Sequence, residues 1–401
     1  MLTARFELRA LCGHLFYLCL GLLLLLHPGE AYQKISDEKL KSLPRPGEDF
    51  DIHTGSLLSP ILRTRVPGTP GHTAVLEHLT NFFRTSLPKW EIEFQNSTSK
   101  TPISHGKEVP FVNFIAYRDP PGVPKGDVGR LTLVAHYDSK IDPKGFIGAI
   151  DSAAPCAMIM HAVRSIDSAL ERKWAAMQEQ GMDLSDEHQG VQVLFLDGEE
   201  AFLEWSATDS LYGARSLAEH WDKQVNPAMS AFKSPLSAIS LFVLLDLLGA
   251  KKPTIQSYYP TTHWAYQNLG TLEKRLRSLD LMKSNKTPWF VDADKNAHQV
   301  VALGGIQDDH LPFLARGVEI LHLIDYAHFR GFPEVWHTAL DDAEHLDMDT
   351  VEDWSVLMTA FAAEWMDLEN FLEHSEAPRQ MEEIERGEDT QTVDDERKTE
   401  L

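Results

Sequence analysis

The sequence predicts an α/β sandwich of three layers, in which a central, mostly parallel mixed sheet is covered by helices on both faces. Three observations support this prediction. Several short segments are almost continuously apolar, which is typical of strands buried on both faces of a sheet. Segments with apolar residues at helical spacing lie between them, and polar residues directly follow the apolar segments. No internal repeat is apparent, so a layered α/β fold is favoured over a repeat architecture.

The expected elements alternate along the chain. Strands are expected at residues 111–117, 130–135, 191–196, 239–245 and 318–323. Helical spacing appears at residues 75–83, again after Asp151, and over residues 351–365. Because ligands bind beyond the carboxyl ends of the strands in such sheets, the residues that follow the strands are the candidates for a functional site.

Composition limits the class of protein. The chain has 401 residues, 43% of them hydrophobic, which is enough for one large core, although its length also permits two domains. The formal charge of -23 and the lack of a Lys/Arg cluster argue against a nucleic-acid partner. Three cysteines are too few for a disulfide-stapled scaffold.

The first residues have the layout of a secretory signal peptide. Arg5 and Arg9 precede an apolar run at residues 15–26, and small residues lead to a cleavage site predicted after Ala31. The run is about half of the roughly 20 residues that span a bilayer, so no stable membrane span is expected. Two sequons, which begin at Asn96 and Asn285, are then candidates for glycosylation.

The residues from 374 onward form an acidic segment. It holds ten acidic and four basic residues and has no apolar periodicity, so we expect a disordered tail. Its last four residues, KTEL, resemble the signal for retention in the endoplasmic reticulum, which leaves secretion and retention both open. The expected organisation is a signal peptide at 1–31, a single catalytic domain at 32–373 and a tail at 374–401.

Carboxylates and imidazoles gather where the predicted strands end. Such side chains follow the second, third and fourth expected strands, open the helix after residue 150, and end the loop that follows the fifth strand; they are His136, Asp138, Asp151, Asp197, Glu199, Glu200, Asp246 and His337. Carboxylate oxygens and imidazole nitrogens are ligands for zinc, and three of them leave a coordination position open for substrate.

Each of these residues also has a simpler explanation. A lone aspartate after a strand, such as Asp138 or Asp246, is usually a turn former or a helix cap. The Glu199-Glu200 pair is more informative, because two adjacent carboxylates after a buried strand repel each other unless a cation is held by one of them. His337 alone could be a loop histidine, but Trp336 before it suggests the wall of a pocket.

Seven motifs together resemble one family. They are RVPGTPG (65–71), HYDSK (136–140), GAIDSAAPC (148–156), DGEEAF (197–202), DSLYG (209–213), QDDH (307–310) and FPEVWH (332–337). In this order they resemble the animal-type glutaminyl-peptide cyclotransferases, or glutaminyl cyclases, over residues 36–372. The resemblance implies the zinc aminopeptidase-like fold, and the conversion of the N-terminal glutamine of peptides or proteins into pyroglutamate with release of ammonia.

The resemblance also implies roles for individual residues. Asp151, Glu200 and His337 match the ligands of a single Zn²⁺, and Glu199 matches the general acid/base. Two buried aspartates of the family, whose hydrogen-bonded arrangement supports proton transfer, match Asp246 and Asp308. The walls of the glutamine pocket match Trp205, His322, Phe332 and Trp336.

Two alternatives remain open on the sequence. A zinc aminopeptidase of the same fold would bind a second metal through His136 and Asp246, with Asp151 as the bridge, and all three residues are present. The SAAPC segment after Asp151, Trp205 and the QDDH segment favour the cyclase. A non-catalytic binding module is disfavoured, because such relatives normally lose a ligand or the base.

The chain departs from the family pattern at two places. Ala135 stands where the secreted animal enzymes have a cysteine that pairs with the one matching Cys156, so Cys156 is expected to be unpaired and to pack as a small apolar residue. The loop from His322 to His337 is a few residues longer than the family pattern and borders the pocket.

Overall fold

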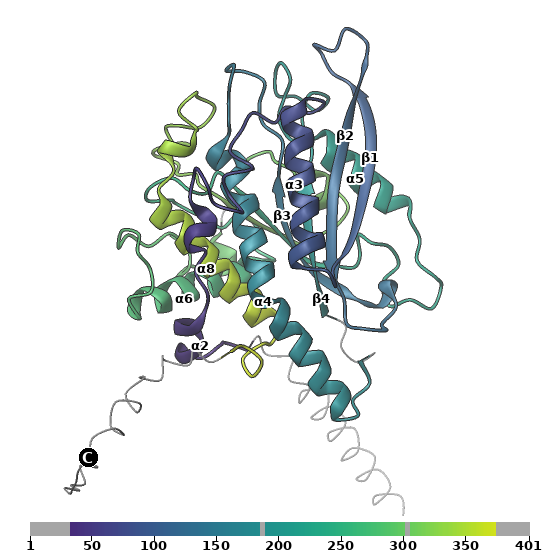
Figure 1. The fold of residues 1–401 in the computed structure, drawn as a ribbon, viewed down its shortest axis with the longest axis vertical. Helices are drawn as coiled ribbons and strands as arrows, with labels where there is room; N and C mark the ends of the chain where they lie inside the picture. Colours follow the sequence, from purple (N-terminus) through teal and green to yellow (C-terminus); the bar gives the residue numbers. More distant parts are fainter. Residues whose placement is uncertain (1–32, 185–188, 301–304, 374–401) are drawn as a thin grey trace, which may run out of the picture.

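The computed structural model describes residues 33–184, 189–300 and 305–373. The predicted signal peptide, the acidic tail and the KTEL sequence therefore lie outside the described residues. A six-stranded sheet with the strand order β1-β2-β4-β3-β5-β6 runs through the described chain (Figure 1).

Four strands of the sheet are parallel to one another. These are β3 (Gly129–His136), β4 (Gln189–Leu196), β5 (Ile239–Asp246) and β6 (Ile320–Ile324). β2 (Glu108–Arg118) pairs antiparallel with β4, and the edge strand β1 (Glu91–Lys100) pairs antiparallel with β2. This confirms the predicted mostly parallel mixed sheet. The parallel strands are buried along nearly their whole length, as continuous apolar segments require.

Helices cover both faces of the sheet. α3 (Pro70–Ser86), α4 (Ala154–Glu179), α6 (His263–Ser278) and α8 (Met348–Trp365) pack on one face, together with the short N-terminal α2 (Asp37–Ser42). α5 (Tyr212–Lys223) and the short α7 (Leu311–Leu314) pack on the other face. Successive strand residues alternate between the two cores; Leu133 belongs to the first and Val134 to the second. The three predicted layers are confirmed (Figure 1).

The predicted elements agree with the structure with local exceptions. Each of the five expected strands is present, although β6 begins two residues later than expected, after a turn in which Gly317 has φ +83°. The expected helices correspond to α3, α4 and α8. β1, α5 and α6 were not predicted. β1 alternates between exposed and half-buried residues and so lacks an apolar run.

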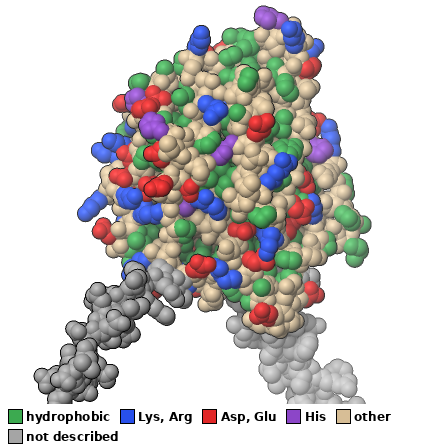
Figure 2. Space-filling model, in the orientation of Figure 1, with side chains coloured by type: hydrophobic (Ala, Val, Ile, Leu, Met, Phe, Trp, Pro, Cys, Tyr) green, Lys and Arg blue, Asp and Glu red, His purple; other side chains and the backbone are tan. Residues whose placement is uncertain are grey.

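The surface carries charges of both signs. On the face drawn in Figure 2, basic side chains are interspersed with acidic ones rather than gathered into one basic surface. Within the described residues, the helices are too short or too polar to cross a bilayer.

Candidate active site

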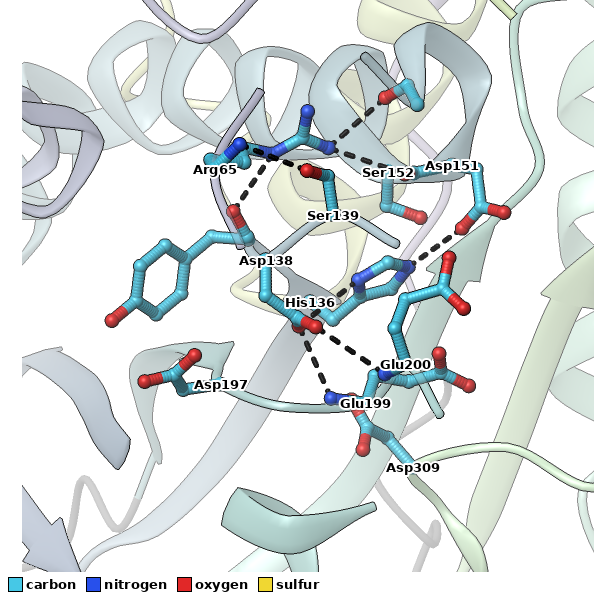
Figure 3. A network of polar contacts seen from close by, with 12 residues as sticks. Arg65, His136, Asp138, Ser139, Asp151, Ser152, Asp197, Glu199, Glu200 and Asp309 are labelled. Atoms are coloured by element: carbon cyan, nitrogen blue, oxygen red, sulfur yellow. Dashed lines mark hydrogen bonds and ion pairs between the residues drawn. The ribbon is translucent and has the colours of Figure 1, made fainter. Parts of the chain in front are cut away.

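The carboxyl ends of β3, β4 and β5 bring the predicted site residues together. β3 ends at His136, β5 ends at Asp246, and β4 leads directly into the turn that carries Glu199 and Glu200. This turn needs a glycine, because Gly198 has φ +67° and a Cβ there would collide with the Phe111 ring. All of these polar side chains are buried, and Figure 3 shows His136, Glu199 and Glu200 close together around Asp138.

Asp138 fixes the two glutamates. Its carboxylate accepts the backbone N–H of Glu199 at 3.1 Å and of Glu200 at 3.3 Å, and it lies 3.4 Å from His136 Nδ1 (Figure 3). The side chain is fully buried. Asp138 therefore orients both glutamates and the imidazole at once, rather than acting as a simple turn former.

Replacement of Asp138 by asparagine should lower the activity while leaving the candidate metal ligands in place. An Asp138→Asn amide directs N–H groups at one of the two backbone N–H donors, so we expect activity to fall by about 10- to 100-fold, as for the loss of an outer-shell partner at a metal site. Steady-state kinetics measure this, with Asp142→Asn, an exposed carboxylate in the same loop, as the matched control. Equal activity of the two variants would contradict the positioning role.

Arg65 holds the loop that presents Asp151. Its buried guanidinium donates to the carbonyl oxygens of Tyr137 (2.8 Å), Ile147, Gly148 (3.0 Å) and Asp151 (3.2 Å). Arginine suits this task because its planar fork offers five N–H donors. The side chain ties the end of β3 to the turn before α4, and so fixes Asp151 relative to His136 (Figure 3).

Asp151, Glu200 and His337 meet as predicted. One ligand atom from each lies within 4.8 Å of the others, and His337 Nε2 lies 3.5 Å from Asp151 Oδ2 and 3.6 Å from Glu200 Oε2. Asp151 Oδ2 and Glu200 Oε1 are buried without a hydrogen-bond partner. Buried carboxylate oxygens without a donor fit a bound cation, and two carboxylates with one imidazole are a zinc-type donor set.

His136 belongs to a second group of such atoms, with Asp151 and Asp246. Its Nε2 lies 2.9 Å from Asp151 Oδ1 and 3.5 Å from Asp246 Oδ1. The Ser152 hydroxyl also donates to Asp246 Oδ1. The Asp246 carboxylate is therefore already engaged by hydrogen-bond donors, unlike the open oxygens of Asp151 and Glu200.

Burial perturbs the ionisation of the site. It raises the pKa of Glu199 well above its usual range, to which the charges of Glu200 and Asp308 add. Burial and then the Asp151 charge likewise raise the pKa of Glu200, and burial with the Asp308 charge raises the pKa of Asp246 to about 6. So many carboxyl groups cannot ionise together in one buried volume unless a cation compensates them.

Asp308 lies beside this network and is bonded to His322. The two side chains meet at 2.7 Å, and the other Asp308 oxygen accepts the Asp309 backbone N–H at 2.6 Å. The resemblance implied a hydrogen-bonded arrangement that includes Asp246 and Asp308. In the structure these two residues share no direct hydrogen bond, because each carboxylate bonds a neighbour of its own; they interact through charge.

A mostly apolar cavity of about 390 Å³ opens onto Glu199, Asp246, and the Asp151 and His337 members of the three-residue group. Trp205, Phe332 and Trp336 line it, whereas His322 is not among the lining residues and is buried in a hydrogen bond with Asp308. Trp205 is held by a 2.7 Å hydrogen bond from its indole N–H to Gln307. The remaining lining residues, which the sequence did not indicate as pocket walls, are Lys140, Leu247, Ile306, Gln307 and Ile324.

The comparisons with known proteins agree with this geometry. Residues 122–362 match the model of Peptidase family M28. The glutaminyl-peptide cyclotransferase-like protein of Bos taurus is 37% identical over 316 residues, which cover 78% of this chain and 75% of that protein. The glutaminyl-peptide cyclotransferase of Bothrops jararaca is 36% identical over 78% of this chain and 80% of its own length. The chain belongs to the glutaminyl-peptide cyclotransferase family.

A solved structure supports the same assignment at the level of the fold. The glutaminyl cyclase of Macrostomum lignano is 29% identical, covers 84% of this chain and 96% of its own, and superposes with a TM-score of 0.69. As a member of the cyclotransferase family, the chain is an enzyme. The match to Peptidase family M28 shows a relationship in fold to these peptidases.

Cys156 is unpaired and buried, as expected from Ala135. Its thiol contacts the His136 carbonyl oxygen at 3.3 Å, and burial raises its pKa to about 12. The residue therefore acts as a small packing group beneath the site rather than as a nucleophile.

Proposed function

We propose that the chain is a zinc-dependent glutaminyl cyclase that converts the N-terminal glutamine of peptides or proteins into pyroglutamate and ammonia. The metal site is the group of Asp151, Glu200 and His337, and it holds one Zn²⁺. Glu199 is the general acid/base. The open side of the metal group faces a cavity walled by Trp205, Phe332 and Trp336, which suits a short side chain enclosed away from water.

One observation carries the choice of a single metal. Within the two groups of possible ligands, Asp151 Oδ2 and Glu200 Oε1 are buried without a hydrogen-bond partner, whereas Asp246 Oδ1 accepts from the Ser152 hydroxyl and lies 3.5 Å from His136 Nε2. A second metal bound at Asp246 Oδ1, the oxygen nearest to His136, would have to displace the Ser152 hydroxyl. The hydrogen bonding around Asp246 thus favours a mononuclear site.

The proposed reaction joins two groups of the same residue. Bound zinc supplies polarisation of the γ-amide carbonyl. Glu199 accepts a proton as the α-amine nitrogen bonds to the amide carbon, and it returns a proton to the nitrogen that leaves as ammonia. Burial raises the pKa of Glu199 above its usual range, which suits a group that must both take and give a proton. No water or oxidant is consumed.

The cavity contributes by holding the glutamine side chain folded. Nucleophile and electrophile belong to one residue, so the aromatic walls mainly fix their relative orientation. Well-oriented intramolecular reactions gain on the order of 7–11 kcal/mol in this way. The Trp205 and Trp336 rings in the cavity wall also exclude water, which disfavours hydrolysis of the amide.

A paired assay tests this function. A Gln-initiated peptide should lose the mass of ammonia, and an otherwise identical Leu-initiated peptide should stay intact. Release of free leucine with no change in the Gln peptide would instead indicate the aminopeptidase that shares this fold. Mass spectrometry of both products decides between the two activities.

We also propose that the chain enters the secretory pathway. Support comes from the signal-peptide pattern at 1–31 and from the sequon at Asn96, whose side chain is exposed on β1 and accessible to a glycan. Expression in a secretory cell should yield a protein that begins at Tyr32 and shrinks on deglycosylation. A mature protein that retains residues 1–31 would contradict this assignment.

A further inference from the structure

The aromatic wall of the cavity continues beyond the cavity itself. Its rings form an unbroken series of contacts, with centroid separations of 4.0 Å from His337 to Trp336, 4.1 Å from Trp336 to Phe332, and 5.0 Å from Phe332 to Tyr326. Tyr326 is half-buried and is not among the residues that line the cavity. The row therefore runs within the long loop after β6, from the proposed metal ligand to the segment at residues 325–331.

Residues 325–331 form a hydrogen-bonded hairpin that exposes a phenylalanine side chain. Ala327 and Gly331 exchange backbone hydrogen bonds of 3.1 and 2.6 Å, and Asp325 pairs with Arg330 across the base. Asp325 also accepts the Thr254 backbone N–H at 2.8 Å, which anchors the base to the body of the protein. Phe329 lies between these anchored ends and is 90% exposed.

Other exposed apolar side chains lie close to the cavity in the chain. Leu203 (70% exposed) comes two residues before Trp205, Leu340 (52%) three after His337, and Ile141 (39%) directly after Lys140. Consecutive Cα atoms are 3.8 Å apart, so each lies within about 11 Å of a lining residue. With Phe329, which comes three residues before Phe332, four of the eleven exposed large apolar residues in the described chain lie within about 11 Å of a lining residue. Such a concentration typically marks a binding surface.

The exposed apolar side chains named above, together with Tyr326, are called the rim. We propose that this rim is a second subsite, which binds an apolar or aromatic side chain in the residues that directly follow the N-terminal glutamine. The inference rests on the proposed function. A glutamine whose amide reaches the metal group and whose amine reaches Glu199 occupies the inner part of the cavity, so the peptide that follows it must leave past Tyr326 and Phe329 or the other exposed apolar side chains around the opening. Tyr326 and Phe329 are the main contacts, because aromatic rings offer large apolar area with little loss of side-chain freedom.

The test compares two peptides that differ only in the second residue, Gln-Phe and Gln-Gly, on the full-length enzyme. The quantity measured is the ratio of their kcat/KM values. We expect a ratio of about 10 for the unchanged enzyme, falling to about 2 or less in Phe329→Ser and in Tyr326→Ala, as for partial loss of an apolar contact. Phe329 is exposed, so its replacement should leave folding intact.

Met229→Ser is the matched control. Met229 is 95% exposed and lies in the segment before the amino end of β5, whereas the site lies at the carboxyl ends of the strands, so the ratio should stay at about 10 in this variant. A ratio near 1 in the unchanged enzyme, or an unaltered ratio in the Phe329→Ser/Tyr326→Ala double variant, would overturn the subsite. Failure of the proposed function looks different, because then neither peptide releases ammonia.

Discussion

Glu199→Gln should lower kcat for cyclisation by about 10²- to 10⁴-fold while the protein still binds its metal ion. The substitution keeps the size of the side chain but removes its ability to accept and return a proton. The three residues of the metal group remain, as do the bonds from Asp138 to the backbone of the two glutamates. Ammonia release and metal content, measured on the same preparation, check the two parts of this expectation.

Glu204→Gln provides the control for that variant. Glu204 belongs to the same loop after β4, and its side chain is exposed. It should retain normal turnover and normal metal content. Turnover of Glu199→Gln at the level of this control would remove Glu199 from the mechanism, and loss of metal from Glu199→Gln would mean that Glu199 is a ligand rather than the proton carrier.

His337→Ala should lose both the metal and the activity. With one of three ligands removed, we expect metal affinity to fall by more than about 100-fold, which is the upper end of the loss from an outer-shell partner alone. The His337 side chain is 28% exposed and packs edge-on against Phe146, so its truncation should leave the fold intact. Competition with a chelator of known affinity measures the change.

His345→Ala is the matched control, because His345 lies eight residues further along and is 43% exposed at its side chain. It should bind metal as the unchanged protein does. Normal metal affinity in His337→Ala, with loss of metal instead in His136→Ala, would shift the site to the group of His136, Asp151 and Asp246.

Much of the fold could be predicted from the sequence, because the parallel strands are buried on both faces and appear as apolar runs. The exception with a physical cause is β1, an exposed edge strand whose polar sequence has no apolar run. α5 is different, because its buried residues Ala214, Leu217, Ala218 and Trp221 stand at helical spacing, so this helix could have been predicted from the sequence.

The place of the site in the fold could be predicted from the ends of the expected strands. Asp151, Glu200 and His337 are far apart in the sequence, but each lies at or beyond a strand end, where an open α/β sheet gathers its functional groups. Their assignment as ligands came from the family resemblance. The supporting contacts could not be predicted, because the bonds of Arg65 to four carbonyl groups and of Asp138 to two backbone N–H groups depend on which loops meet in space.

The arrangement of the long loop after β6 also could not be predicted from the sequence. The sequence indicated an insertion near the pocket. It did not indicate that Tyr326 continues the row of rings from Phe332, or that Phe329 projects from an anchored hairpin.

Anomalous diffraction at the zinc absorption edge, from crystals of the purified enzyme, tests the central claim most directly. We predict a single peak, coordinated by Asp151, Glu200 and His337, with the Glu199 carboxylate uncoordinated beside it. Two peaks bridged by Asp151, with His136 and Asp246 binding the second, would contradict the account and indicate a dinuclear aminopeptidase site.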